Sequence, residues 1–160
     1  MQERELKPRS LGYTMPAEWE PHAATWLSWP HKSDSWPGKF DPVPRVFAEI
    51  VKHLCEHEVV NINVSDDRME REALRQISAS GVTRPEGRVR MHRVLTNDAW
   101  ARDHGPMFVT RALGDNRREP AIVDWEFNAW GGNTRPTTST TRCRPESPKF
   151  LMCRASRPAS

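Results

Sequence analysis

The chain has 160 residues, of which 36% are hydrophobic and 28% are charged, and its formal net charge is +3. This size and composition support one modest core, and we expect neither a membrane span nor a signal peptide, because no apolar run of about 18 residues exists and the N-terminus is charged. Three unpatterned cysteines, Cys55, Cys143 and Cys153, argue against a disulfide framework or a zinc site and are typical of a reducing cytoplasm.

The first part of the chain predicts a strand, a loop and a helix. Residues 24–29 are β-branched and aromatic up to Pro30, which predicts a strand. Residues 30–44 are rich in Pro, Trp, Asp and Gly and predict a long loop, a kind of segment that is often functional. A helix is expected from Pro44 onward. Its apolar stripe at helical spacing consists of Val46, Phe47, Ile50, Val51 and Leu54.

A second strand and helix follow. Residues 58–64 favour a strand, and the acidic sequence 65–67 favours the start of a helix that ends at Gly81. Residues 89–94 alternate and predict a third strand. The expected buried face of this second helix consists of Met69, Ala73, Leu74 and Ile77.

The remaining elements are strands. We expect one strand through Val109, a polar hairpin connection over residues 111–119 and another strand over residues 121–127. The order strand, helix, strand, helix, strand, strand, strand indicates an α/β fold in which helices pack over a mixed sheet.

The net positive charge of the chain comes from its C-terminal end. Residues 133–160 hold six basic residues and one acidic residue, whereas residues 1–132 hold 18 basic and 20 acidic residues. The Thr, Pro and Arg content of residues 133–160 predicts a disordered basic tail. One hypothesis is therefore a non-catalytic α/β binding module whose tail binds nucleic acid or an acidic partner.

The segment over residues 97–106 carries the densest chemistry. It reads Asn-Asp-Ala-Trp-Ala-Arg-Asp-His-Gly-Pro and lies on a loop between two predicted strands, where ligand-binding groups are often found. A carboxylate beside an aromatic face suits a planar guanidinium cation. The alternative is an ordinary turn with a local ion pair between Arg102 and Asp103.

Other side chains have simpler interpretations. Cys55 ends the apolar side of a helix and is expected to be a small core residue. His53 and His57 are four residues apart but lack a third ligand, so we expect no metal site. His104 lies in the dense segment without neighbours that fix its role. Packing is the expected role of Trp19, Trp26, Trp29 and Trp36, with one of them lining a ligand pocket as the alternative.

Four motifs in this order resemble the agmatine deiminase and bacterial-type peptidylarginine deiminase family. They are Met-Pro-Ala-Glu-Trp-Glu-Pro-His at 15–22, Trp-Leu-Ser-Trp-Pro at 26–30, the segment at 97–106, and Phe-Asn-Ala-Trp-Gly-Gly at 127–132. The resemblance covers residues 12–132. It implies the pentein fold, a fivefold α/β propeller, of which residues 1–132 would form a partial domain with about two ββαβ-type modules from its N-terminal portion.

The resemblance also implies a chemistry. In this family a Cys thiolate attacks the guanidinium carbon and expels ammonia, and water then releases a ureido product, with no metal and no organic cofactor. Asp103 matches the guanidinium-binding Asp, and Trp100 matches the aromatic residue beside it, whereas Asp98 and Arg102 are assigned to loop structure. The implied substrate is agmatine, which would yield N-carbamoylputrescine for putrescine formation, or a peptidyl-arginine side chain.

The segment after Gly132 departs from the family. The nucleophilic Cys and the His-x-Asp motif are absent, and neither Cys143 nor Cys153 matches the nucleophile. We therefore expect a cytoplasmic chain that is inactive alone, with a small guanidinium compound as its ligand and no membrane or nucleic-acid partner. When degenerate codons for residues 133–144 are read one nucleotide earlier, they permit an amino-acid sequence typical of the family. Our hypothesis is therefore that residues 133–160 are translated out of frame.

Overall fold

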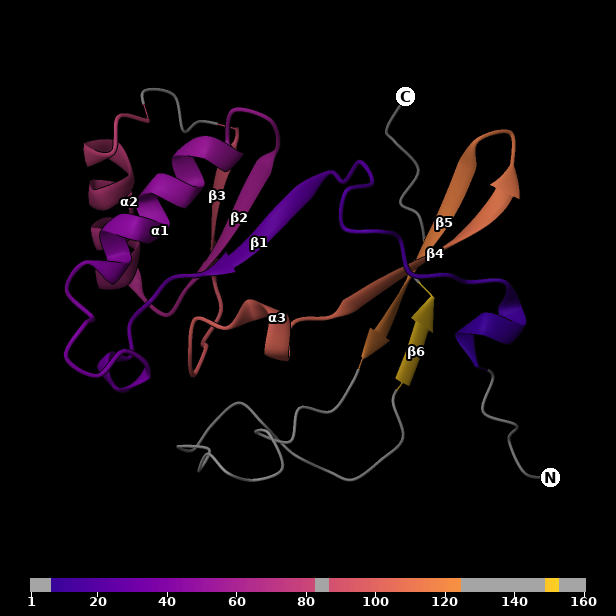
Figure 1. Cartoon of the computed structure of the whole chain (residues 1–160), viewed down its shortest axis with the longest axis horizontal. Helices are drawn as coiled ribbons and strands as arrows, with labels where there is room; N and C mark the ends of the chain where they lie inside the picture. Colours follow the sequence, from indigo (N-terminus) through magenta and orange to yellow (C-terminus); the bar gives the residue numbers. More distant parts are fainter. Residues whose placement is uncertain (1–6, 83–86, 125–148, 153–160) are drawn as a thin grey trace. The chain divides into compact units, whose positions relative to one another are not determined.

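The computed structural model describes residues 7–82, 87–124 and 149–152 (Figure 1). The described residues fall into two compact units: residues 21–104 form one unit, and the other combines the N-terminal segment up to residue 20 with the described residues after 104. The strands form two separate sheets, one in each unit. The mixed single sheet expected from the sequence is therefore wrong for the described strands, because the parallel and antiparallel strands do not pair with each other.

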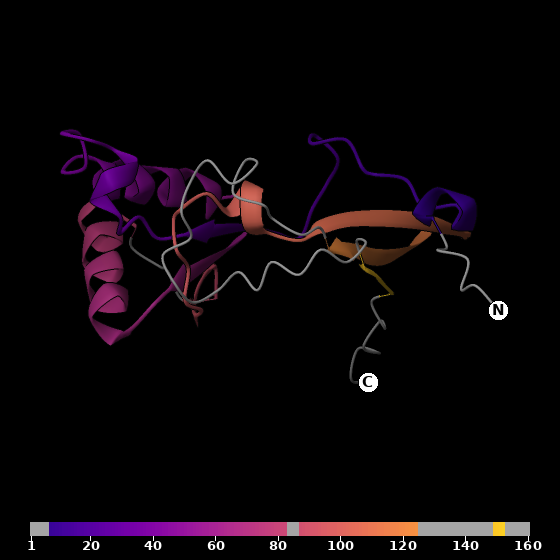
Figure 2. The ribbon, with the colours of Figure 1, turned by 90° about the horizontal axis from the view of Figure 1, so that it is seen from below.

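The unit of residues 21–104 contains a parallel sheet covered by two helices. Its strands β1 (Ala24–Ser28), β2 (Val59–Val64) and β3 (Val89–Arg93) are hydrogen-bonded in the order β1-β2-β3. The connections contain α1 (Val43–Leu54) and α2 (Asp67–Ala79), as parallel neighbours require a crossover. Figures 1 and 2 show both helices on the same face of the sheet. The three strands and two helices expected here are confirmed, with shifts of about one residue at their ends.

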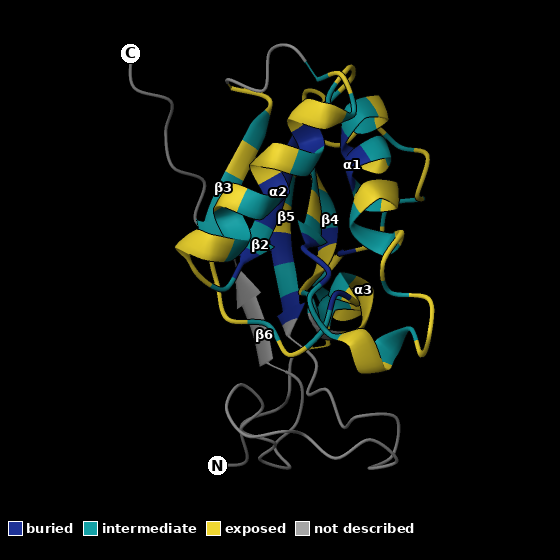
Figure 3. Cartoon of the chain, turned by 90° about the vertical axis from the view of Figure 1, so that its left-hand side faces the viewer, coloured by how far each residue is buried: buried dark blue, intermediate teal, exposed yellow. Residues whose placement is uncertain are grey.

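The core of this unit lies between the sheet and the helices. Its buried members are Trp29, Val60, Ile62 and Val64 from the sheet side and Ala48, Val51, Ala73 and Ile77 from the helices. The outer faces of both helices are exposed (Figure 3). The predicted stripes are partly wrong, because Val46, Ile50 and Leu74 are at least 39% exposed. The apolar sequence is wider than the face that the sheet covers, and Ala48 takes the inner position on α1.

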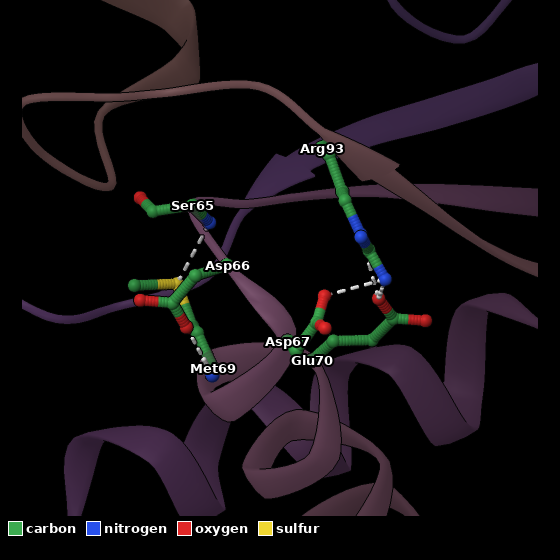
Figure 4. A network of polar contacts seen from close by, with 6 residues as sticks. All are labelled: Ser65, Asp66, Asp67, Met69, Glu70 and Arg93. Atoms are coloured by element: carbon green, nitrogen blue, oxygen red, sulfur yellow. Dashed lines mark hydrogen bonds and ion pairs between the residues drawn. The ribbon is translucent and has the colours of Figure 1, made fainter.

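The start of α2 is fixed by side chains on both sides of it (Figure 4). Asp66 is the N-cap residue and accepts a hydrogen bond of 2.8 Å from the backbone N–H of Met69. Arg93, at the end of β3, forms ion pairs of 2.5 Å with Asp67 and 3.3 Å with Glu70. Acidic residues also suit the positive end of the helix dipole. The predicted cap is confirmed.

The other unit is built on a long β-hairpin. Strands β4 (Met107–Gly114) and β5 (Arg117–Asp124) pair antiparallel, and the two residues between them, Asp115 and Asn116, have φ angles of 50° and 59°. Two central residues with positive φ match the twist of a tight hairpin, and Asp and Asn tolerate that conformation. The expected hairpin within residues 111–119 is confirmed, but its connection is shorter than expected: most of the range is strand, and the turn at 115–116 joins the strands.

A short strand from the C-terminal segment completes this sheet. Strand β6 (Lys149–Met152) pairs antiparallel with β5, with Ala121 opposite Met152 and Asp124 opposite Lys149. The prediction of disorder for residues 133–160 is wrong at these four residues. Their sequence, Lys-Phe-Leu-Met, is the most apolar run of the tail, and the free edge of β5 offers it unpaired backbone groups. The rest of residues 133–160 lies outside the described residues.

The N-terminal segment packs on the same hairpin. After the 3₁₀ helix η1 (Pro8–Leu11), Thr14 forms an antiparallel bridge with Thr110. The buried Tyr13 donates a hydrogen bond of 2.7 Å to Glu119, and Arg111 forms a 2.5 Å ion pair with the same carboxylate. Buried Tyr13, Val109, Ala121 and Val123 make up a second, smaller core. Within the described ranges, no helix is both long enough and apolar enough to cross a membrane.

Candidate functional site

Two loops of the parallel-sheet unit carry the candidate site. One follows β1 and contains the 3₁₀ helix η2 (Ser33–Ser35), and the other follows β3 and contains the four-residue helix α3 (Ala101–His104). Both loops leave the carboxyl ends of parallel strands, and ligands of open α/β sheets bind beyond this edge. The structure brings the two loops into direct contact through two pairs of side chains.

Asp103 is the open carboxylate of the site. Its side chain is exposed, and among the residues whose side chains are described it has no hydrogen-bond or ion-pair partner. Its backbone N–H donates a 3.1 Å hydrogen bond to the carbonyl of Trp100. Residues three apart on one helical turn are surface neighbours. Trp100 and Asp103 therefore lie one turn apart, at a spacing that allows the ring and the carboxylate to face the same ligand.

Trp100 is held by one face and exposed elsewhere. Its ring stacks on Trp36, with centroids 5.5 Å apart and planes 29° apart. Despite this stack the residue is 45% exposed. Trp36 in turn contacts Phe40, with ring centroids 6.0 Å apart. The Trp100 ring is thus supported by Trp36 and remains partly exposed.

Asp98 differs from Asp103 because its carboxylate is occupied. One oxygen accepts a hydrogen bond from the hydroxyl of Ser35, and the other accepts a 2.7 Å hydrogen bond from the backbone N–H of Ala99. Ala99 itself is 7% exposed. These contacts confirm the prediction that Asp98 serves the structure of its loop. Among the described side chains, the two carboxylates of this segment thus differ: Asp98 is engaged at both oxygens, and Asp103 is not.

The other residues singled out in the sequence do not join this site. Cys55 packs against the core of its unit and contacts the carbonyl of Lys52 at 3.3 Å, as expected for a core residue. His57 is 83% exposed in its side chain, and in the described parts of the chain no three His, Cys, Asp or Glu side chains converge on one point. The side chain of His104, and Cys143 and Cys153, lie outside the description.

The four tryptophans of the first third of the chain have different environments. Trp29 is a core residue at 2% exposure, whereas Trp19 is 88% exposed. Trp26 lies on the sheet and packs on His92, with ring centroids 4.7 Å apart. Trp36 packs within its loop and against the candidate site. Sequence reasoning missed the partnership of Ser35 and Trp36 with the second loop, and the available signal was that both loops follow parallel strands.

Comparison with known proteins shows which family this chain resembles. The sequence profile of the Porphyromonas-type peptidyl-arginine deiminase family matches residues 14–153. The match ends 21 residues after Gly132, the last residue of the fourth motif. The agmatine deiminase of Pseudomonas aeruginosa (strain LESB58) is 39% identical over 125 residues, which cover 78% of this chain and 31% of that protein.

Solved structures give the same result. The agmatine deiminase of Enterococcus faecalis aligns with a TM-score of 0.63 and 34% identity, over 78% of this chain and 31% of that one. A putative arginine deiminase from Porphyromonas gingivalis aligns with a TM-score of 0.53 and 30% identity, over 76% and 32%. The chain thus spans about a third of the length of these relatives. It has the mixed α/β structure of the pentein proteins that it matches, and it belongs to the Porphyromonas-type peptidyl-arginine deiminase family.

Proposed function

We propose that this chain supplies the part of a deiminase that binds the guanidinium group of the substrate. The observation that carries the proposal is that the exposed Asp103 and the partly exposed Trp100 lie three residues apart and are joined by a backbone hydrogen bond. A carboxylate accepts two parallel hydrogen bonds from a guanidinium group. An aromatic face covers the flat cation and attracts its charge. The two side chains thus complement the edge and the face of the same group.

The reaction proposed for the whole protein is hydrolysis of a guanidinium C–N bond. Agmatine and water would give N-carbamoylputrescine and ammonia, and a peptidyl-arginine side chain would give citrulline and ammonia. The relatives named agmatine deiminases, at 39% and 34% identity, support agmatine as the first choice. As further proposals that rest on the family resemblance, the product serves putrescine formation and the protein acts in the cytoplasm.

The covalent step needs side chains that lie outside the third of the relatives' length that this chain matches. The resemblance assigns it to a Cys thiolate, a His that transfers protons and a second carboxylate, all in segments that follow the Trp-Gly-Gly motif. We therefore expect this chain to bind the guanidinium group without turning it over. It would form about two of the five modules of a propeller.

The absence of turnover is directly testable. Ammonia release from agmatine by the purified chain should equal the uncatalysed background, because loss of the members of a catalytic unit removes nearly all of the rate enhancement. A variant with Cys143→Ser and Cys153→Ser is the matched control. Turnover that survives both changes would contradict this division of roles, and turnover that either change removes would identify a replacement nucleophile.

Guanidinium binding is tested with the chain and two ligands. Titration calorimetry should detect agmatine binding but no binding of putrescine, the diamine without the guanidinium group. Asp103→Asn should weaken agmatine binding by about 10-fold or more, because a hydrogen bond to a charged group contributes about 1.5–3 kcal/mol. Asp115→Asn, an equal change in the turn of the hairpin, should leave binding unchanged. Equal affinity of the Asp103→Asn variant would refute the assignment.

A further inference from the structure

We propose that Ser35 and Trp36 are positioning residues, which hold the loop at residues 97–104 so that one face of Trp100 stays open and Asp103 is its free carboxylate. The proposal rests on the guanidinium-binding function above and deepens it. Ser35 and Trp36 belong to a different loop from Trp100 and Asp103. They act on the ligand only through Asp98 and Trp100.

Two consecutive residues make two different contacts with the second loop. The hydroxyl of Ser35 donates a hydrogen bond to the carboxylate of Asp98, and the ring of Trp36 stacks on Trp100. The two residues contacted, Asp98 and Trp100, lie two positions apart. A hydrogen bond and an aromatic stack at adjacent positions fix both the distance and the tilt of one loop against the other, which neither contact does alone.

The supporting loop is itself braced. The backbone N–H of Trp36 donates to the carbonyl of Ser33 at 3.0 Å, and its carbonyl accepts from Lys39 at 2.9 Å. The ring of Trp36 also rests against Phe40. The candidate loop contains α3, a helix of four residues, and such a short helix depends on tertiary contacts. The braced loop of Ser35 and Trp36 supplies two of these contacts.

The hydrogen bond from Ser35 has a second consequence for selectivity between the two carboxylates. With Ser35 and Ala99 bound to its two oxygens, Asp98 is engaged within the protein. Asp103 has no such partner among the described side chains. Removing the Ser35 hydroxyl frees one oxygen of Asp98, which then competes for the cation at a site without the aromatic face. The loss of one hydroxyl should thus change both ring orientation and ligand affinity.

The orientation of Trp100 is measured by circular dichroism of the intact chain, because two stacked indoles give a coupled pair of bands in the far ultraviolet. Trp36→Phe should abolish this couplet and so assign it, whereas Trp19→Phe should leave it unchanged. Ser35→Ala should reduce the couplet at an unchanged thermal midpoint, Ser35→Thr should restore it, and Ser33→Ala is the matched control. A couplet of full amplitude in Ser35→Ala would overturn the proposal.

Agmatine titrations of the same variants separate this proposal from the proposed function. Ser35→Ala and Trp36→Leu should each bind about fivefold more weakly than the unchanged chain, while Ser35→Thr and Trp36→Phe should retain binding. Failure of the unchanged chain to bind agmatine would overturn the proposed function. Normal agmatine affinity in Ser35→Ala and Trp36→Leu, in a chain that binds agmatine, would overturn the positioning role alone.

Discussion

The carboxylates of the two units show different uses of the same chemical group. In the hairpin unit, Glu119 accepts a hydrogen bond from the buried Tyr13 and pairs with Arg111, whose guanidinium also lies 4.9 Å from the centre of the Tyr13 ring. In the parallel-sheet unit, Asp103 is exposed and no described side chain occupies it.

The groups around Glu119 already include a guanidinium from the chain itself, whereas we propose that Asp103 receives one from a ligand. A carboxylate, a guanidinium and an aromatic ring come together around Glu119, with all three parts supplied by the protein. Asp103 and Trp100 supply a carboxylate and a ring three residues apart, and no described side chain pairs with this carboxylate. The difference supports our proposal that Asp103 and Trp100, which follow the carboxyl end of a parallel strand, bind a guanidinium from outside.

The largest effect on stability is expected from the core of the parallel-sheet unit. Ile62→Ala removes a fully buried side chain beneath both helices and should lower the free energy of unfolding by about 3–4 kcal/mol. Val46→Ala, on the exposed side of α1, should cost less than about 1 kcal/mol. Urea unfolding measures both. Similar losses for the two variants would mean that the core is not where the structure places it.

Breaking the contacts among Tyr13, Arg111 and Glu119 should have the next largest effect on stability. Arg111→Ala removes the ion pair to Glu119, the hydrogen bond to the carbonyl of Leu11 and the contact with the Tyr13 ring. We expect a loss in the free energy of unfolding that clearly exceeds the loss in a surface control. Arg117→Ala, on the exposed start of β5, is the control and should change stability by less than about 0.5 kcal/mol. A loss no larger than that of the control would show that these contacts contribute nothing to folding.

The same contacts should make stability depend on pH. The hydrogen bond from Tyr13, and then the hydrogen bond and charge of Arg111, lower the pKa of Glu119 below its ordinary value of 4.5. Its contribution is therefore fully present above pH 4.5 and is lost as pH falls through the lowered pKa. Glu119→Gln should flatten the acid side of a stability profile. An unchanged acid slope in this variant would place the pH dependence on other carboxylates.

The smallest effect on stability is expected at the open carboxylate. Asp103→Asn breaks no contact among the described side chains, so thermal unfolding should change by less than about 0.5 kcal/mol. The same substitution is expected to weaken agmatine binding strongly. A large stability loss here would make Asp103 a structural residue like Glu119, and the distinction between the two carboxylates would disappear.

Local patterns in the sequence predicted most of the parallel-sheet unit. The β-branched runs indicate the strands, and the acidic cap at Asp66 and the Gly81 residue mark the ends of a helix. The hydrogen bonds of these elements are local or follow from the crossover connections. The hairpin was predicted less well, because Pro120 and the many polar residues around it are typical of connections, while pairing with β4 keeps them extended. Strand β6 depends on a partner edge far away in the sequence, which no local pattern indicates.

The candidate site shows the same division. The family motif at 97–106 assigns Asp103 and Trp100, because both residues belong to one short segment. Ser35 and Trp36 could not be assigned from sequence, since their role arises from a contact with residues more than 60 positions away. The pairing of the two loops requires the parallel order of β1, β2 and β3, and this order is a property of the fold.

The most direct test of the central claim is to map agmatine onto the chain by nuclear magnetic resonance. In a ¹⁵N-labelled sample, agmatine should shift the indole N–H of Trp100 and the backbone N–H of Asp103, while the indole N–H of the core residue Trp29 stays in place. Putrescine at the same concentration should shift none of them. If agmatine and putrescine produce the same shifts, or if agmatine moves signals elsewhere and leaves Trp100 and Asp103 unchanged, these residues do not form a guanidinium site.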